Sequence, residues 1–206
     1  GFDAEGVASA PDRYGTTLVS LVATALDRID PSPFRWVVLG GSADPVARPG
    51  NVVRTSGLTE TGGGVVYEGV PLAGVEVEID ETGEIALRAP TVARGRRAAD
   101  GHVVGLVDDQ GWLHTGDLGH WTGDGRLVVE GRADDLIVTG GENVWPGPVE
   151  DALRTHPLVA DALVVGEPDA EWGQRVVAIV VPLSPGVAPS LDALRSHVKD
   201  RLPAYA

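Results

Sequence analysis

Short apolar runs separated by turn formers dominate the first two thirds of the chain. Runs of this length are too short for helices, and their alternating or β-branched residues are typical of strands. The predicted strands are residues 35–39, 52–55, 65–67, 75–79, 84–88, 102–107 and 126–130. Closely spaced strands with turns between them indicate a β-barrel-like or sandwich unit over residues 65–131. Residues 56–64, rich in glycine and threonine, are predicted to form a loop.

The N-terminal pattern leaves two interpretations open. Residues 1–14 show no periodicity and are predicted to form a loop. Apolar residues then fall on one helical face over residues 17–29, but residues 16–19 could equally form a strand that leads into a shorter helix. Residues 94–101, further along the chain, contain three arginines and show no apolar pattern. We interpret that segment as a solvated loop, with contact to phosphate as the alternative.

Beyond residue 132 the pattern changes. A short strand at 136–138 runs into a Gly-Gly pair, and a helix is predicted at about 149–155, after two prolines suited to a helix start. Strands follow at 160–165 and 175–181, and Ser190 can cap a last helix. Strand–helix alternation predicts a small α+β domain over residues 132–206, joined near residues 131–135 to a larger domain, residues 1–131.

Composition narrows the function classes. The 206 residues are 43% apolar, which is normal for a globular chain, and the net charge of −14 would repel nucleic acid and anionic membranes. The absence of cysteine excludes disulfides and thiolate chemistry. No apolar run approaches the roughly 20 residues needed to span a bilayer, and without a recognisable secretory signal we expect a cytoplasmic protein. The chain starts at Gly1 and lacks methionine, so we expect a piece of a longer protein.

Some residues suggest chemistry by their setting. The strand at 35–39 runs into Gly40, Gly41 and Ser42, and strands that end in glycine turns often approach a ligand; an ordinary turn is the alternative. Glu60, behind Thr59, could hold Mg²⁺, which takes one or two protein oxygens together with phosphate. Asp117 follows a Thr-Gly pair that we interpret as a turn, and its carboxylate could accept hydrogen bonds from ribose hydroxyls.

Three motifs extend this interpretation. They are GLTE at residues 57–60, GWLHTGD at 111–117 and GRADDLIVTGGENVWPGPVE at 131–150. In this order they resemble the motifs of the adenylate-forming superfamily, which comprises acyl-CoA synthetases, peptide-synthetase adenylation domains and luciferases. The resemblance implies an α+β chain: the end of the large domain, with an α/β piece and a β-barrel-like subdomain, joined by a hinge to a small C-terminal domain.

The resemblance implies roles for individual residues on the nucleotide side. Residues 40–42 and 56–57 would contact the adenine. Thr59 would contact the α-phosphate and Glu60 would hold Mg²⁺, which makes these two the catalytic candidates. Asp117 and Arg132 would bind the ribose of ATP or AMP.

The same resemblance assigns the small domain to acyl transfer. Asp134 matches the hinge position, where one residue absorbs the rotation of the small domain. Gly140, Gly141 and Glu142 would line the tunnel through which the pantetheine arm of CoA reaches the acyl-adenylate. Trp172 resembles a position near the CoA arm, and a tryptophan packed between strand and helix is the alternative.

The chain departs from the family pattern in three places. Ser56 stands where the family usually has an aromatic residue that stacks on adenine, and stacking is worth about 1–3 kcal/mol, or roughly 5- to 150-fold in affinity. The glycine-rich phosphate loop and the C-terminal catalytic lysine have no counterpart in these residues. Each lost donor to a developing phosphoryl charge costs about 10²–10³ in rate, so we expect negligible adenylation by this chain alone.

Residues 62–72, GGGVVYEGVPL, are most similar to the 2-succinylbenzoate–CoA ligases of menaquinone biosynthesis. The expected activity is therefore that of an ATP-dependent acyl-CoA ligase, with a carboxylic acid, Mg-ATP and CoA as ligands. Another acyl- or aryl-CoA synthetase is the alternative within the same class. A non-catalytic homologue that binds nucleotide or CoA is the alternative outside it. The sequence predicts no oligomeric state.

Overall fold

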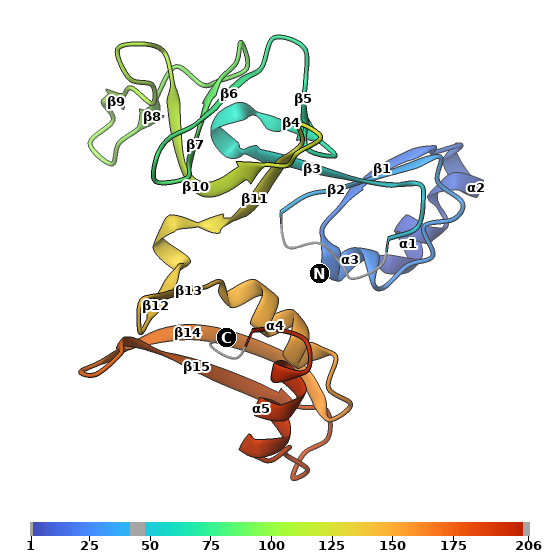
Figure 1. Cartoon of the computed structure of the whole chain (residues 1–206). Coiled ribbons are helices and arrows are strands. Elements are labelled where there is room, and N and C mark those ends of the chain that lie inside the picture. The colour runs from blue at the N-terminus through green and yellow to red at the C-terminus, as the bar shows by residue number, and fades with distance from the viewer. Residues whose placement is uncertain (1, 42–47, 204–206) are drawn as a thin grey trace. The chain divides into compact units, whose positions relative to one another are not determined.

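The computed structural model describes residues 2–41 and 48–203 of this α+β chain (Figure 1). The chain divides into two compact units, residues 1–129 and 130–206. The division falls within a single strand, β11 (Leu127–Arg132), close to the start of the 131–150 motif. Among the described residues, two hydrophobic clusters lie in the first unit and one lies in the second.

The first unit begins with a mixed five-stranded sheet of order β1-β2-β3-β4-β5. Its strands are β1 (Leu18–Leu21), β2 (Trp36–Leu39), β3 (Val52–Leu58), β4 (Gly63–Tyr67) and β5 (Val70–Pro71). The pairings β1–β2 and β2–β3 are parallel, and β3–β4 and β4–β5 are antiparallel. Val37 and Leu39 of β2 are almost fully buried, whereas Trp36 is 44% exposed, so one face of this strand supplies its core contacts.

Short helices precede and follow β1. The predicted loop at residues 1–14 is wrong, because α1 (Ala4–Ala8) and α2 (Ala10–Tyr14) form there. The Asp3 side chain caps α1 by accepting a hydrogen bond from the Gly6 N–H, and α2 has a proline in its first turn. These helix-start signals, rather than an apolar face, favour the two short helices. At residues 16–29 the strand alternative is confirmed, since β1 is followed by the four-residue helix α3 (Ala23–Leu26).

A second sheet of order β11-β10-β7-β6 packs on the first. Its remaining strands are β6 (Glu76–Ile79), β7 (Glu84–Arg88) and β10 (Leu113–Trp121). Residues of β4, β7 and β11 form one core, so the predicted β-rich unit is realised as two packed sheets. A small hairpin, β8 (Arg96–Arg97) and β9 (Val103–Val104), lies between β7 and β10 in the sequence.

Three predictions in this unit need correction. The nine-residue strand β10 was not predicted, because its glycines and its His-Thr-Gly-Asp sequence suggested a turn. The strand predicted at 102–107 contracts to the two residues of β9. The loop predicted from Ser56 starts later, since β3 continues to Leu58 and a 3-10 turn, η1 (Thr59–Thr61), follows. For β10 the cause is long-range pairing with β7, whereas β9 and the end of β3 pair with strands nearby in the sequence.

The second unit is a four-stranded antiparallel sheet of order β13-β12-β15-β14 with two helices (Figure 1). Its elements are η2 (Ala133–Asp135), β12 (Ile137–Thr139), β13 (Glu142–Val144), α4 (Pro146–Arg154), β14 (Val159–Asp169), β15 (Gly173–Pro182) and α5 (Leu191–Lys199). Both helices share one core with the sheet. Ser190 caps α5 through the Ala193 N–H, as the sequence predicted. Helix α4 starts at Pro146, three residues before the predicted start.

Among the residues that the structure describes, no helix is long and apolar enough to cross a bilayer.

Candidate functional site

Parallel strands β2 and β3 place two of the predicted segments at one edge of the sheet. Leu39 pairs with Arg54, the last parallel pair, so Gly40 leaves β2 where β3 continues through Ser56 to Leu58. A Cβ added to Gly40 would lie 3.5 Å from the Thr55 methyl group, in ordinary contact. Gly41 has φ +82°, which a residue with a side chain rarely adopts. Ser42, the third residue predicted here, lies outside the described residues.

The turn after β3 is closed by its backbone. A Cβ added to Gly57 would lie 2.1 Å from the Gly63 carbonyl oxygen, so no side chain fits between β3 and β4 at this point. Thr61 is 2% exposed, and its hydroxyl accepts a hydrogen bond from the Leu58 N–H at 2.9 Å while lying 2.7 Å from the Gly63 carbonyl. Glycine and a buried hydroxyl together fix the path of η1.

Thr59 and Glu60 lie on this fixed turn. Thr59 is exposed and Glu60 is half-buried. Within the described part of the chain, the Glu60 carboxylate forms no hydrogen bond or ion pair, and no group of three potential metal ligands occurs. Mg²⁺ commonly takes only one or two carboxylates and completes its shell with phosphate and water. The position of Glu60 is therefore compatible with its predicted role as the single protein ligand of nucleotide-bound Mg²⁺.

Asp117 lies within strand β10, where a turn was predicted. The strand nevertheless has an irregular register between His114 and Leu118, and Gly116 has φ +68°, so a bulge replaces the predicted turn. Thr115 is 7% exposed; its hydroxyl donates to the Ile85 carbonyl at 2.6 Å and accepts from the Asp117 N–H at 3.0 Å. This buried threonine fixes the backbone from which the Asp117 side chain emerges.

One small cavity joins the two parts of the candidate site in the first unit. Its volume is about 20 Å³, and its lining includes Ser56, Gly57, Thr115 and Asp117 together with apolar residues of β4, β7 and β11. These residues are about 60 positions apart in the sequence, and the packing of the two sheets brings them together. The cavity has room for about one water, so a larger ligand would lie against these residues.

A larger cavity of about 170 Å³ lies elsewhere in the same unit, between β6, β7 and the start of β10. His114 contributes to it, with Nδ1 3.5 Å from Glu84 and Nε2 3.3 Å from Asp108. Backbone hydrogen bonds from Trp112 and Gln110 hold the pKa of Asp108 below its usual range. None of the predicted site residues lines this cavity.

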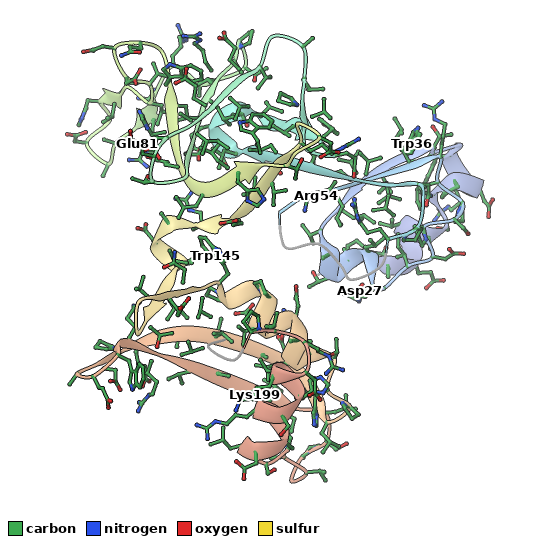
Figure 2. The ribbon with its side chains drawn as sticks, viewed as in Figure 1. Asp27, Trp36, Arg54, Glu81, Trp145 and Lys199 are labelled. Carbon is green, nitrogen blue, oxygen red and sulfur yellow. The ribbon has the colours of Figure 1, made fainter. Side chains whose placement is uncertain are left out.

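The second unit carries the predicted linker residues. Arg132 ends β11, and Asp134 is exposed in the middle of the 3-10 turn η2. Trp145, labelled in Figure 2, lies against the same segment: a Cβ added to Gly131 would come within 2.9 Å of its ring. Gly131 therefore permits close packing of the strand end against the residue that precedes α4.

The Gly140-Gly141 pair forms the turn of the β12–β13 hairpin. Both residues have positive φ, +58° and +85°, as a two-residue hairpin turn requires, and Glu142 follows at the start of β13. The Gly140 N–H donates to the Trp172 carbonyl at 2.9 Å, and a Cβ on Gly140 would lie 2.7 Å from the Trp172 ring. A Cβ on Gly141 would meet nothing within 4 Å.

Trp172 lies at the tip of the β14–β15 hairpin and is 53% exposed. Asp169 accepts hydrogen bonds from the Trp172 and Glu171 N–H groups, and these lower the pKa of its carboxyl. The ring therefore packs on the glycine turn, and the alternative of a tryptophan between strand and helix does not hold. The second unit brings together Gly140, Gly141 and Trp172.

Comparisons with known proteins show what the chain is similar to. Residues 148–206 match the family described as the AMP-binding enzyme C-terminal domain. Over its whole length the chain is 42% identical to a "probable 2-succinylbenzoate–CoA ligase" of Mycobacterium tuberculosis, of which it covers 58%. The chain belongs to the adenylate-forming superfamily.

Solved structures agree. The o-succinylbenzoate CoA synthetase (MenE) of Bacillus subtilis, in complex with its acyl-adenylate intermediate OSB-AMP, is 30% identical with a TM-score of 0.82, over 99% of this chain and 48% of that one. The same enzyme in complex with ATP and magnesium ion has a TM-score of 0.81 at 30% identity, over 99% of this chain and 49% of that one. The chain thus spans about half the length of the relatives it matches.

Thr61 and Thr115 were missed by the sequence analysis. Both lie close to the predicted residues in the sequence, and among the described residues of the first unit they are the two buried polar ones. A threonine among glycine and charged residues gives no periodic signal of burial, so only the pairing of distant strands reveals its role. The sequence signal that could have located them is that each threonine directly precedes a glycine, Gly62 and Gly116.

Proposed function

We propose that this chain is part of an ATP-dependent acyl-CoA ligase whose carboxylic acid is 2-succinylbenzoate. The observation that carries the proposal is 42% identity along the whole chain to a probable 2-succinylbenzoate–CoA ligase. The arrangement around Asp117 supports it, because a glycine, two hydroxyl side chains and a carboxylate from distant strands meet at one cavity. Domains would follow the sequence analysis, with residues 1–131 binding nucleotide and acid and residues 132–206 acting in acyl transfer.

The overall reaction takes place in two steps. A carboxylate oxygen of the acid attacks the α-phosphorus of ATP, and pyrophosphate leaves from that phosphorus to give an acyl-adenylate. The sulfur of CoA then attacks the acyl carbon, AMP leaves with the bridging oxygen, and the thiol proton passes to solvent. The mixed anhydride makes the second step favourable because AMP is a far better leaving group than the oxygen of a free carboxylate.

Residues of the first unit would hold the nucleotide. The carboxylate of Asp117 would accept hydrogen bonds from the ribose hydroxyls, at a backbone position that the buried Thr115 fixes. The Thr59 hydroxyl would donate to the α-phosphate from the turn that Gly57 and Thr61 close. Bound at Glu60, Mg²⁺ would offset the negative charge of the phosphates.

Residues of the second unit would serve the transfer to CoA. Arg132 would reach the ribose, and Asp134 would absorb the change in backbone angles when the small domain rotates. The open side of Gly141 would admit the pantetheine arm, and Glu142 and Trp172 would lie beside that path. Glycine suits this position because a side chain would occupy the space above the turn.

The full-length protein that contains this chain, assayed for acyl-CoA formation with a panel of carboxylic acids, tests the proposal. We expect 2-succinylbenzoate to be the preferred acid. Asp117→Ala should raise the KM for ATP about 10- to 100-fold, because charge-assisted hydrogen bonds are worth about 1.5–3 kcal/mol. Asp124→Ala, an exposed turn aspartate of the same unit, is the matched control and should change little.

The outcomes separate the alternatives. If the protein preferred a different acid, the proposed substrate would be wrong, but the proposed acyl-CoA ligase activity would stand. Nucleotide binding without acyl-CoA formation from any acid would instead indicate a non-catalytic homologue, which is the outcome that Ser56 would favour.

A further inference from the structure

The β8–β9 hairpin carries a local excess of basic residues, although the protein as a whole is acidic. The chain has 30 acidic and 16 basic residues, yet residues 94–97 contain three arginines and no acid. Arg96 and Arg97 form β8 and pair with Val104 and Val103 of β9. We call residues 94–104 the arginine hairpin.

The backbone attaches this hairpin to the turn that carries Glu60. The Ala93 N–H donates to the Glu60 carbonyl oxygen at 2.7 Å. Arg94 is the next residue, and successive Cα atoms are about 3.8 Å apart. The first arginine therefore starts beside η1 although 34 positions separate it from Glu60 in the sequence.

Two of the three guanidinium groups are not engaged by the protein. Arg94 and Arg96 are exposed, and within the described residues neither forms a hydrogen bond or an ion pair. Arg97 donates to the Gly101 carbonyl at 3.0 Å. The nearest acid along the chain, Asp100, is paired with His102. On a chain with this excess of carboxylates, two unpaired arginines beside each other leave a local positive charge.

Close packing holds the base of the hairpin. A Cβ added to Gly95 would lie 2.5 Å from a Val103 methyl group and 2.6 Å from the Val104 carbonyl oxygen, so this residue is pressed against β9. The Ala98 N–H donates to the His102 carbonyl at 2.8 Å and closes the other end. Arg94 and Arg96 therefore flank a fixed point of the backbone, and only their side chains need to be ordered by a ligand.

We propose that Arg94 and Arg96 bind the polyphosphate end of the nucleotide, the β- and γ-phosphates of ATP and the pyrophosphate that leaves. The proposal rests on the proposed function, in which the α-phosphate lies at Thr59 and Glu60. A guanidinium group can bind two phosphate oxygens at once. The hydrogen bond from Ala93 to Glu60 places Arg94 beside that turn, and Arg96 follows two residues further along the chain. They supply positive charge where a protein of net charge −14 would otherwise repel a polyanion.

The test uses the double variant R94Q/R96Q of the full-length protein in ATP–pyrophosphate exchange. We expect the KM values for pyrophosphate and for Mg-ATP to rise about tenfold, the loss of one to two solvent-exposed charge-assisted hydrogen bonds. The Kd for AMP should change less than about twofold, since AMP has no phosphate beyond the α position. Arg13→Gln, another exposed arginine of the same unit, removes one positive charge away from this turn and should leave all of these constants unchanged.

A second measurement distinguishes the two sources of phosphate in the reaction. The KM ratio of CoA to 3′-dephospho-CoA should be the same in R94Q/R96Q and in the unmodified protein. A change confined to that ratio, or equal losses for AMP and ATP, would overturn the proposal. Unaltered constants for pyrophosphate with normal AMP binding would also overturn it, and would leave the proposed function intact. Failure of the unmodified protein to bind AMP would defeat the proposed function, and this assignment with it.

Discussion

The two glycine turns of this protein use the same residue for opposite reasons. In the β3–β4 turn, Gly57 is pressed against the Gly63 carbonyl, and the buried Thr61 fills the remaining space. In the β12–β13 turn, Gly141 faces open space and only Gly140 is covered, by the exposed Trp172. One turn excludes side chains because the protein occupies the space; the other leaves the space free. In the proposed function, the first turn would hold a ligand group in a fixed position and the second would leave a path for one.

The largest expected effect tests the closed turn. Gly57→Ala should lower the free energy of unfolding by about 3 kcal/mol, because the added Cβ must displace backbone on β4. Gly62→Ala is the control: Gly62 has φ +71° and no neighbour within 4 Å, so it should cost only the left-handed strain of about 1–2 kcal/mol. Urea denaturation measures both. Equal losses would mean that backbone conformation alone, and not contact, closes the turn.

An intermediate effect tests the open turn. In the full-length protein, Gly141→Leu should leave acyl-adenylate formation intact and slow transfer to CoA about 10- to 100-fold, since misplacing a reactant by about 1 Å can cost 10²-fold. Gly186→Leu, with φ +80° and equally open surroundings in the same unit, carries the same strain at a position without an assigned role. Single-turnover measurements of each half-reaction separate the steps. Normal transfer in Gly141→Leu would rule out the tunnel.

The smallest effect compares the response of the two units to acid. Arg48 lowers the pKa of Glu68 from its usual 4.5, through an ion pair at 2.8 Å, and the Arg54 N–H also donates to this carboxylate. A depressed folded-state pKa adds stability above the unfolded-state pKa, and that stability is lost as the pH falls through the folded-state value. In the second unit burial raises the pKa of Asp151 above 3.8, so ionised Asp151 costs stability that is recovered on acidification.

Denaturation between pH 7 and 3 should therefore give opposite trends. Glu68→Gln should destabilise by about 0.5–1 kcal/mol at neutral pH and by progressively less below about pH 4.5, because the pair is partly exposed. Asp151→Asn should be most favourable at neutral pH and lose its advantage in acid. Parallel pH profiles for the two variants would contradict the opposite pKa shifts of Glu68 and Asp151.

Sequence patterns located most strands and supplied the candidate site residues. The apolar runs at β2, β4, β6 and β7 were predicted within one or two residues, and the serine cap of α5 was confirmed. The three sequence motifs were sufficient to identify the superfamily. The roles assigned to Glu60, Asp117 and Gly141 remain proposals, although the structure gives each a definite setting.

The amino-acid sequence by itself determined the features that depend on neighbours along the chain: alternating strands, glycine turns, helix caps and the charge of the surface. Tertiary structure alone decided that Thr115 is buried against Ile85, that Gly57 touches Gly63, that Trp172 covers Gly140 and that Ala93 binds Glu60. The reason is physical. Local propensities differ by less than about 1 kcal/mol per residue, whereas pairing and burial with distant segments fix the partner of each polar group. Strand β10 shows this most clearly, since its local sequence suggested a turn and its pairing with β7 and β11 makes it a strand.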